Sequence, residues 1–131
     1  MRSILAERPT AARSVELIAR GLPWANAEAL AQALGLSLER LASLLDIPQA
    51  TFYRRRRARR FSKQESDRLV RFARLWWLAT DVFESDDGAR TWLRSPQFGL
   101  NGAVPLEYAT TEAGARAVED LLRRIDHGVL A

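Results

Sequence analysis

The chain has 131 residues, 47% hydrophobic and 27% charged with a net charge of +4, a globular composition that fits one domain or two small subdomains. It contains no cysteine, which excludes disulfides, cysteine-ligated zinc, iron–sulfur clusters and thiol nucleophiles. The single histidine, His127, excludes a metal site built from two imidazoles of one chain, and no G-x-S-x-G segment supports a Ser–His–Asp triad.

Leucine and alanine total 40 residues, whereas valine and isoleucine total 10, and no stretch sustains a period-two alternation of apolar residues. Because β-branched residues are enriched in strands, this balance predicts an all-α chain. No apolar run approaches the roughly 20 residues of a membrane span, and Met1–Thr10 lacks the apolar core of a signal peptide. We therefore expect a cytoplasmic protein with no membrane segment.

Two helices are expected in the first part of the chain. Ser14 is predicted to begin the first, and Gly21 to end it. The second follows Pro23-Trp24 and ends at Gly35, the expected residue just past its last turn. The apolar positions are Val15, Leu17 and Ile18 in the first helix, and Leu30, Ala33 and Leu34 in the second.

The segment from Leu41 to Phe52 has the spacing of a helix-turn-helix motif. Ser37 is predicted to cap a helix over Leu38–Leu45, and Pro48 suits the first position of the next helix. Between them, Asp46-Ile47 is expected to form a tight turn, in which Asp46 tolerates left-handed backbone geometry.

Two further positions fit the same motif. Ala42 supplies the small residue that is needed where the two helices cross closely. Ile47 and Phe52 are expected to hold the turn and the second helix against the core.

The second helix of the motif continues into a run of arginines. From Arg54 to Arg74 there are ten basic residues and two acidic ones, a local charge of +8, whereas residues 1–53 are neutral and residues 75–131 carry −4. Such asymmetry indicates two partners of different character. Only one of the 20 cationic residues is lysine, which fits bidentate contacts to phosphate or guanine.

The pattern predicts a recognition helix in a DNA groove, with arginine suited to guanine, glutamine to adenine, and other arginines neutralising phosphates. The predicted DNA-binding residues are Gln49, Ala50, Thr51, Tyr53, Arg54, Arg57, Arg59 and Arg60. A plainer interpretation is a solvated helix end, where cations are mildly favourable in any case. DNA operators pair half-sites, so a homodimer is expected.

A second subdomain is expected after the arginine run, which divides the chain into residues 1–60 and 61–131. Ser62 and Glu65 form a capping box that opens a long helix. Acids after Ser85 favour the start of another helix, and Thr111 caps the last one, which Gly128 ends. Pro96–Pro105 is expected to be a loop with an Asn101-Gly102 turn. Of Trp76, Trp77, Phe83 and Trp92, about three are expected to pack in the core.

Several runs resemble a known family, the Xre/MbcA/ParS antitoxins. Those similar to its toxin-binding domain are Trp92–Pro96, Pro105–Glu107, Thr111–Ala115 and Val118–Val129. Those similar to its Xre-type helix-turn-helix region are Leu34–Ala42 and Leu69–Arg74. The resemblance covers about residues 20–131.

The resemblance implies the antitoxin of a type II toxin–antitoxin pair, which needs no cofactor or metal. The cognate toxin would be a RES-domain enzyme that consumes NAD+, inhibited when the C-terminal end of the antitoxin covers its active-site cleft, and the antitoxin or complex would repress its own operon. The implied toxin-binding residues are Trp92, Arg94, Pro96, Asn101, Glu107, Arg124, Ile125, His127, Gly128, Val129, Leu130 and Ala131.

Other interpretations stay open on the residues alone. The tail Val129-Leu130-Ala131 could enter a cleft built for an anionic dinucleotide, or fold back on its own domain. The chain could be a stand-alone regulator whose C-terminal half dimerises or senses a ligand. An enzyme would need carboxylates such as Asp86 and Asp87, which already have a structural role at a helix start. His127, near a helix end, is expected to be a surface residue rather than a catalytic one.

Overall fold

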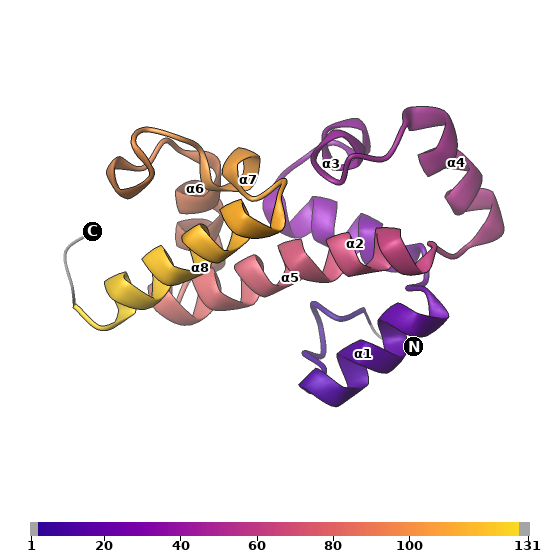
Figure 1. The fold of residues 1–131 in the computed structure, drawn as a ribbon, viewed down its shortest axis with the longest axis horizontal. Helices are drawn as coiled ribbons and strands as arrows, with labels where there is room; N and C mark the ends of the chain where they lie inside the picture. The colour runs from indigo at the N-terminus through magenta and orange to yellow at the C-terminus, as the bar shows by residue number, and fades with distance from the viewer. Residues whose placement is uncertain (1–2, 129–131) are drawn as a thin grey trace. The chain divides into compact units, whose positions relative to one another are not determined.

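The structure is a computed structural model that describes residues 3–128 (Figure 1). Within this range the regular elements are helical, apart from one isolated antiparallel bridge between Pro23 and Arg60, so the all-α prediction is confirmed. The elements in order are α1 (Ala11–Arg20), α2 (Ala25–Leu34), α3 (Leu38–Leu44), α4 (Gln49–Ala58), α5 (Lys63–Phe83), α6 (Asp86–Arg94), the 3-10 turn η1 (Phe98–Leu100), α7 (Pro105–Tyr108) and α8 (Glu112–Asp126).

The chain forms two compact units, and the division between them falls between Ala73 and Arg74. We call them the N-terminal unit and the C-terminal unit. The boundary lies inside α5, not after residue 60 as expected, because the first half of this helix packs with the helices that precede it. No helix in the described part of the chain is long and apolar enough to cross a membrane.

The first helix begins earlier than its sequence pattern predicts. The hydroxyl of Thr10 accepts a hydrogen bond from the N–H of Arg13 at 3.1 Å and caps α1, whereas Ser14 lies inside the helix, its N–H bonded to the Thr10 carbonyl. Gly21 ends the helix as expected, with φ 86°. A side chain there would overlap the carbonyl oxygen of Phe61, so this position requires glycine for space as well as for its backbone angle.

The core of the N-terminal unit combines leucines with an aromatic cluster. The ring centroid of Trp24 lies 4.7 Å from that of Phe52 and 5.4 Å from that of Phe61. Two hydrogen bonds join the same region, from Trp24 N–H to the Arg59 carbonyl and from Phe61 N–H to the Leu22 carbonyl, both 2.9 Å. The C-terminal end of α4 is thereby fixed to the connection between α1 and α2. The leucines buried with the cluster are Leu22, Leu30, Leu34, Leu41 and Leu45.

The C-terminal unit contains the second half of α5 and the elements from α6 to α8. The predicted cap of α8 is confirmed, since the Thr111 hydroxyl accepts from Gly114 N–H at 3.0 Å. The helix expected after Ser85 is also present, and the Ser85 hydroxyl caps it by accepting from Gly88 N–H at 3.0 Å. The fully buried side chains of this unit include Leu93, Leu106, Val118, Leu121 and Leu122, whereas Ile125 is half-buried.

Two expectations for this unit need correction. The segment Pro96–Pro105 is not a plain loop, since it contains η1 and ends where Pro105 begins α7, a helix too short to show a periodic pattern. Two of the four aromatic residues, rather than about three, are buried in the core: Trp76 and Trp77. Phe83 and Trp92 are half-buried and pack on each other with ring centroids 5.7 Å apart. The Asn101-Gly102 turn is confirmed, with φ 55° and 84°.

Candidate functional site

The turn between α3 and α4 ends α3 with the hydrogen bonds of a Schellman motif. The N–H of Ile47 bonds to the carbonyl of Ala42 at 3.0 Å, and the N–H of Asp46 to that of Ser43 at 3.1 Å. Asp46 has φ 56° and takes the left-handed position that is usually glycine, which confirms its predicted role. Pro48 is the N-cap rather than the first residue of α4.

The inner face of α4 is held by packing and by an ion pair. Phe52 is fully buried, and Arg55, one turn further, donates two hydrogen bonds to the carboxylate of Glu65, at 2.7 and 3.1 Å. The same carboxylate accepts from the N–H of Ser62 at 2.8 Å, which completes the predicted capping box. Arg55, although part of the arginine run, therefore positions α4 against α5.

These contacts change the acidity of Glu65. Burial alone raises the pKa of this carboxyl, but the bonds from Arg55 and Ser62 outweigh it and lower the pKa below the ordinary value of 4.5. A carboxylate whose folded pKa is depressed contributes stability that is fully present above its unfolded pKa. That stability is lost as the pH falls through the folded pKa.

Glu65→Gln is expected to lower the free energy of unfolding at pH 7 by about 1.5 kcal/mol, because charge-assisted bonds become neutral ones. The deficit relative to wild type should shrink as the pH falls below 4.5. Urea denaturation at pH 7 and pH 3.5 measures both effects. The control is Glu16→Gln, which removes the exposed ion pair to Arg13 and should cost about 0.3 kcal/mol. Equal losses for both variants would contradict the assigned role of Glu65.

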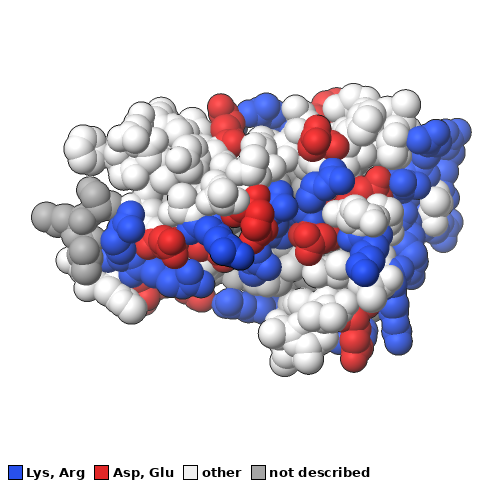
Figure 2. All heavy atoms as spheres, viewed as in Figure 1, with Lys and Arg blue, Asp and Glu red and all other residues white. Residues whose placement is uncertain are grey.

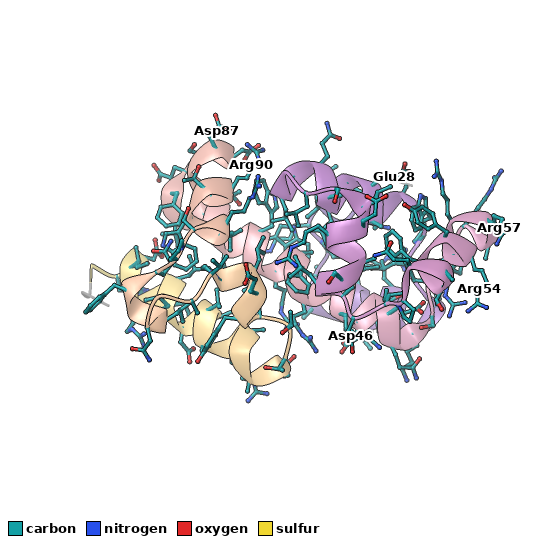
Figure 3. The ribbon with its side chains drawn as sticks, turned by 90° about the horizontal axis from the view of Figure 1, so that it is seen from above. Glu28, Asp46, Arg54, Arg57, Asp87 and Arg90 are labelled. Carbon is teal, nitrogen blue, oxygen red and sulfur yellow. The ribbon has the colours of Figure 1, made fainter. Side chains whose placement is uncertain are left out.

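The outer face of α4 is cationic and open to solvent. Gln49, Ala50, Arg54 and Arg57 are exposed there, and Figure 3 shows Arg54 and Arg57 extending outward from the helix. In Figure 2 basic atoms gather over α4, at the right of the view. Arg57 makes no hydrogen bond or ion pair within residues 3–128, and Arg54 donates one bond, to the Thr51 hydroxyl at 2.9 Å.

Two of the predicted DNA-binding side chains are bonded to α3. The Tyr53 hydroxyl donates to the Glu39 carboxylate at 2.7 Å, and the Gln49 amide donates to the Glu39 carbonyl at 3.0 Å. The bond from Tyr53 lowers the pKa of Glu39 and raises the pKa of the tyrosine. These bonds fix the angle between α3 and α4. Tyr53 and Thr51 are half-buried.

The last two residues of the predicted set lie past the end of α4. Arg59 has φ 64° and ends the helix in left-handed geometry, with its side chain exposed. The guanidinium of Arg60 donates to the carbonyl of Gly21 at 2.5 Å. Arg60 thus ties the helix end to the residue that terminates α1.

The predicted toxin-binding residues lie in two groups within the C-terminal unit. Arg94, Pro96, Asn101 and Glu107 are exposed between the end of α6 and α7, whereas Trp92 is half-buried. Trp92 also lines a shallow hollow of about 480 Å³, with Phe83, Asp87, Gly88, Thr91, Ser95 and Gln97.

The second group lies at the end of α8. Arg124, His127 and Gly128 are exposed and Ile125 is half-buried, so the surface position expected for His127 is observed. Gly128 follows the helix with φ 74°. Val129, Leu130 and Ala131 lie outside the described residues.

The carboxylates considered for catalysis are ordinary helix-start residues. Asp86 and Asp87 are exposed in the first turn of α6, and Asp87 pairs with Arg90 at 2.7 Å (Figure 3). Among residues 3–128 no three His, Asp or Glu side chains gather in a way that could hold a metal ion.

Both units match domains of one family of known proteins. Residues 13–74 match the antitoxin Xre-like helix-turn-helix domain, and residues 78–128 match the antitoxin Xre/MbcA/ParS C-terminal toxin-binding domain. An antitoxin Xre from Yersinia enterocolitica is 34% identical over 146 residues, which cover 96% of this chain and 99% of the relative. This chain belongs to the Xre antitoxin family.

Two further Xre antitoxins match part of the chain. That of Photorhabdus laumondii is 38% identical over 73 residues, 55% of this chain and 49% of the relative. That of Pseudomonas putida is 38% identical over 64 residues, 49% of this chain and 40% of the relative.

Sequence reasoning missed three features of this Xre-family chain. The first is Glu39, which receives bonds from two residues of α4; no local pattern marks it. The second is the pairing of Arg55 with Glu65. The position of Arg55 three residues after Phe52, on the same face of the helix, could have indicated that Arg55 turns inward. The third is Phe98, an aromatic residue of η1 that is 90% exposed.

Proposed function

We propose that this chain is an antitoxin that neutralises a cognate toxin and represses the operon encoding both proteins. One observation carries the proposal: the same chain contains a helix-turn-helix unit with an outward cationic helix and a unit that matches a toxin-binding domain. It acts by occupying surfaces, without a cofactor or chemistry of its own.

The proposed DNA partner is the operator, bound by a homodimer. The exposed face of α4 supplies Gln49, Ala50, Arg54 and Arg57 to base edges and phosphates. Arg59 adds charge at the helix end, whereas Thr51, Tyr53 and Arg60 support the helix through the bonds described above.

The proposed protein partner is a RES-domain enzyme that consumes NAD+ in the cytoplasm. The segment that follows Ile125 covers its active-site cleft. Residues from Trp92 to Glu107 form the rest of the surface that the toxin covers.

Deletion of Val129–Ala131 is expected to abolish toxin inhibition and leave DNA affinity unchanged. Inhibition is measured by growth on co-expression with the protein of the neighbouring reading frame, which the proposal requires to be a RES-domain enzyme, together with NAD+ consumption by the purified complex. A gel shift with the operon's own promoter gives the DNA control.

Two outcomes would overturn parts of the proposal. If the truncated protein still neutralises the toxin fully, the tail does not cover the active site. If the full chain binds the promoter but never relieves toxicity, it acts as a regulator alone.

A further inference from the structure

The segment Ser95–Leu106 in the C-terminal unit is the longest stretch of this sequence without a charged residue, twelve positions in a chain that is 27% charged. The next longest, Ala29–Leu38, lies mostly in α2 and carries buried leucines. By contrast, five residues of Ser95–Leu106 are exposed: Pro96, Phe98, Gly99, Asn101 and Gly102. An uncharged surface is typical of the centre of a protein–protein interface, where charged residues are depleted.

The segment is held in one conformation by its own hydrogen bonds. Gln97 N–H bonds to the Ala103 carbonyl at 3.0 Å, and the Gln97 carbonyl accepts from Gly102 at 2.9 Å and from Leu100 at 3.1 Å. The Gln97 amide donates to the carbonyl of Trp92 at 2.9 Å. Leu100 is buried, and η1 contacts α8. Such a segment loses little conformational entropy when a partner covers it.

Phe98 stands on this rigid segment with 90% of its surface exposed, more than Val15 at 68% or Tyr108 at 44%. Its neighbour Gly99 is also exposed. The fold gains nothing from a phenylalanine in this position, whereas burying its ring against a partner would be strongly favourable. Aromatic residues, phenylalanine among them, are enriched at protein–protein interfaces.

We propose that Phe98 is the anchor through which the antitoxin holds its toxin, by inserting its ring into an apolar pocket with an uncharged rim. The toxin is the occupant because Ser95–Leu106 lies wholly within residues 78–128, which match the toxin-binding domain. The inference rests on the proposed function and deepens it. Phe98 supplies affinity, and the tail after Gly128 supplies inhibition.

This division of roles predicts different defects for the two surfaces. Loss of the Phe98 ring should weaken the complex, yet inhibition should return when the antitoxin is in large excess. Loss of the tail should leave a complex that forms but does not inhibit at any concentration. Phe98→Tyr keeps an aromatic ring and should bind far better than Phe98→Ala.

The test is isothermal titration of full-length Phe98→Ala and Phe98→Tyr with the purified protein of the neighbouring reading frame, which the proposed function requires to be a RES-domain enzyme. We expect Phe98→Ala to raise the Kd about 30-fold or more, the effect of losing a hot-spot residue. Its thermal unfolding should stay unchanged because the ring makes no core contact. The matched control is Val15→Ala, an exposed apolar residue of the N-terminal unit, which should leave the Kd unchanged.

Every other result decides against the inference. A Kd for Phe98→Ala within threefold of wild type refutes the anchor. If light scattering shows that Phe98→Ala halves the mass of the free antitoxin while its toxin affinity is unchanged, the segment binds a second copy instead. If the wild-type chain itself does not bind the RES-domain protein, the proposed function is wrong, and the proposed role of Phe98, which rests on it, is wrong as well.

Discussion

Gly114→Ala is expected to lower the free energy of unfolding of the C-terminal unit by about 3 kcal/mol or more, the cost of severe overpacking. Gly114 lies in the first turn of α8, where it is buried against the end of α7. A Cβ at this position would overlap the carbonyl oxygen of Tyr108 and lie 2.9 Å from its carbonyl carbon. Both atoms belong to the backbone, so the clash cannot be relieved by turning a side chain.

Gly88→Ala provides a control that is matched in local structure. Gly88 occupies the same position in the first turn of α6, and its N–H bonds to the Ser85 hydroxyl as that of Gly114 bonds to Thr111. A Cβ there would lie 3.4 Å from the Cβ of Phe83, an ordinary contact. Because alanine loses less backbone entropy than glycine in a helix, this variant should gain about 0.5 kcal/mol.

Urea denaturation followed by near-ultraviolet circular dichroism measures both glycine variants, and hydrogen exchange of the α8 amides assigns the loss to the C-terminal unit. If Gly114→Ala is as stable as Gly88→Ala, the close approach of α7 to α8 is wrong. A loss confined to α4 amides would also contradict the assignment.

Helix ends were predictable where one local hydrogen bond decides them. Ser37, Thr111 and the Ser62–Glu65 pair each cap the helix expected from their sequence. The start of α1 was misplaced because Thr10 and Ser14 are both good capping residues about one turn apart, and only the folded chain chooses between them. The role of Gly114 was out of reach because it depends on α7, whose four residues show no periodicity.

The candidate sites were predictable as segments but not as individual contacts. The arginine run indicates a cationic helix. Four of the predicted DNA-binding residues do lie on the exposed face of α4, namely Gln49, Ala50, Arg54 and Arg57. Arg55, however, turns inward, because it lies three residues after the buried Phe52, and its partner Glu65 is ten residues further along the chain. Exposure of Phe98 is likewise a tertiary property, since most phenylalanines in an apolar segment are buried.

Arg54→Ala combined with Arg57→Ala is expected to weaken operator binding about 100-fold at 0.1 M salt. At this salt concentration the Debye length is about 10 Å, so contacts between the arginines and the phosphates are only partly screened. The two guanidinium groups share the outer face of α4, three residues apart, and neither pairs with a carboxylate in the described part of the chain (Figure 3). Each phosphate-binding arginine that the variant removes should also reduce the slope of log K against log salt concentration by about 1.

The matched control removes the same charge from the other unit. Arg116→Ala with Arg123→Ala also deletes two exposed arginines, which make only loose pairs with Glu112 and Asp120 at 3.6 and 3.7 Å. If binding depended on net charge alone, both double variants would lose equal affinity. Fluorescence anisotropy with the promoter fragment at several salt concentrations separates the cases. A specific recognition helix requires that only the α4 variant lose affinity, and that it lose more on the promoter than on unrelated DNA, because base contacts act on one sequence while phosphate contacts act on all.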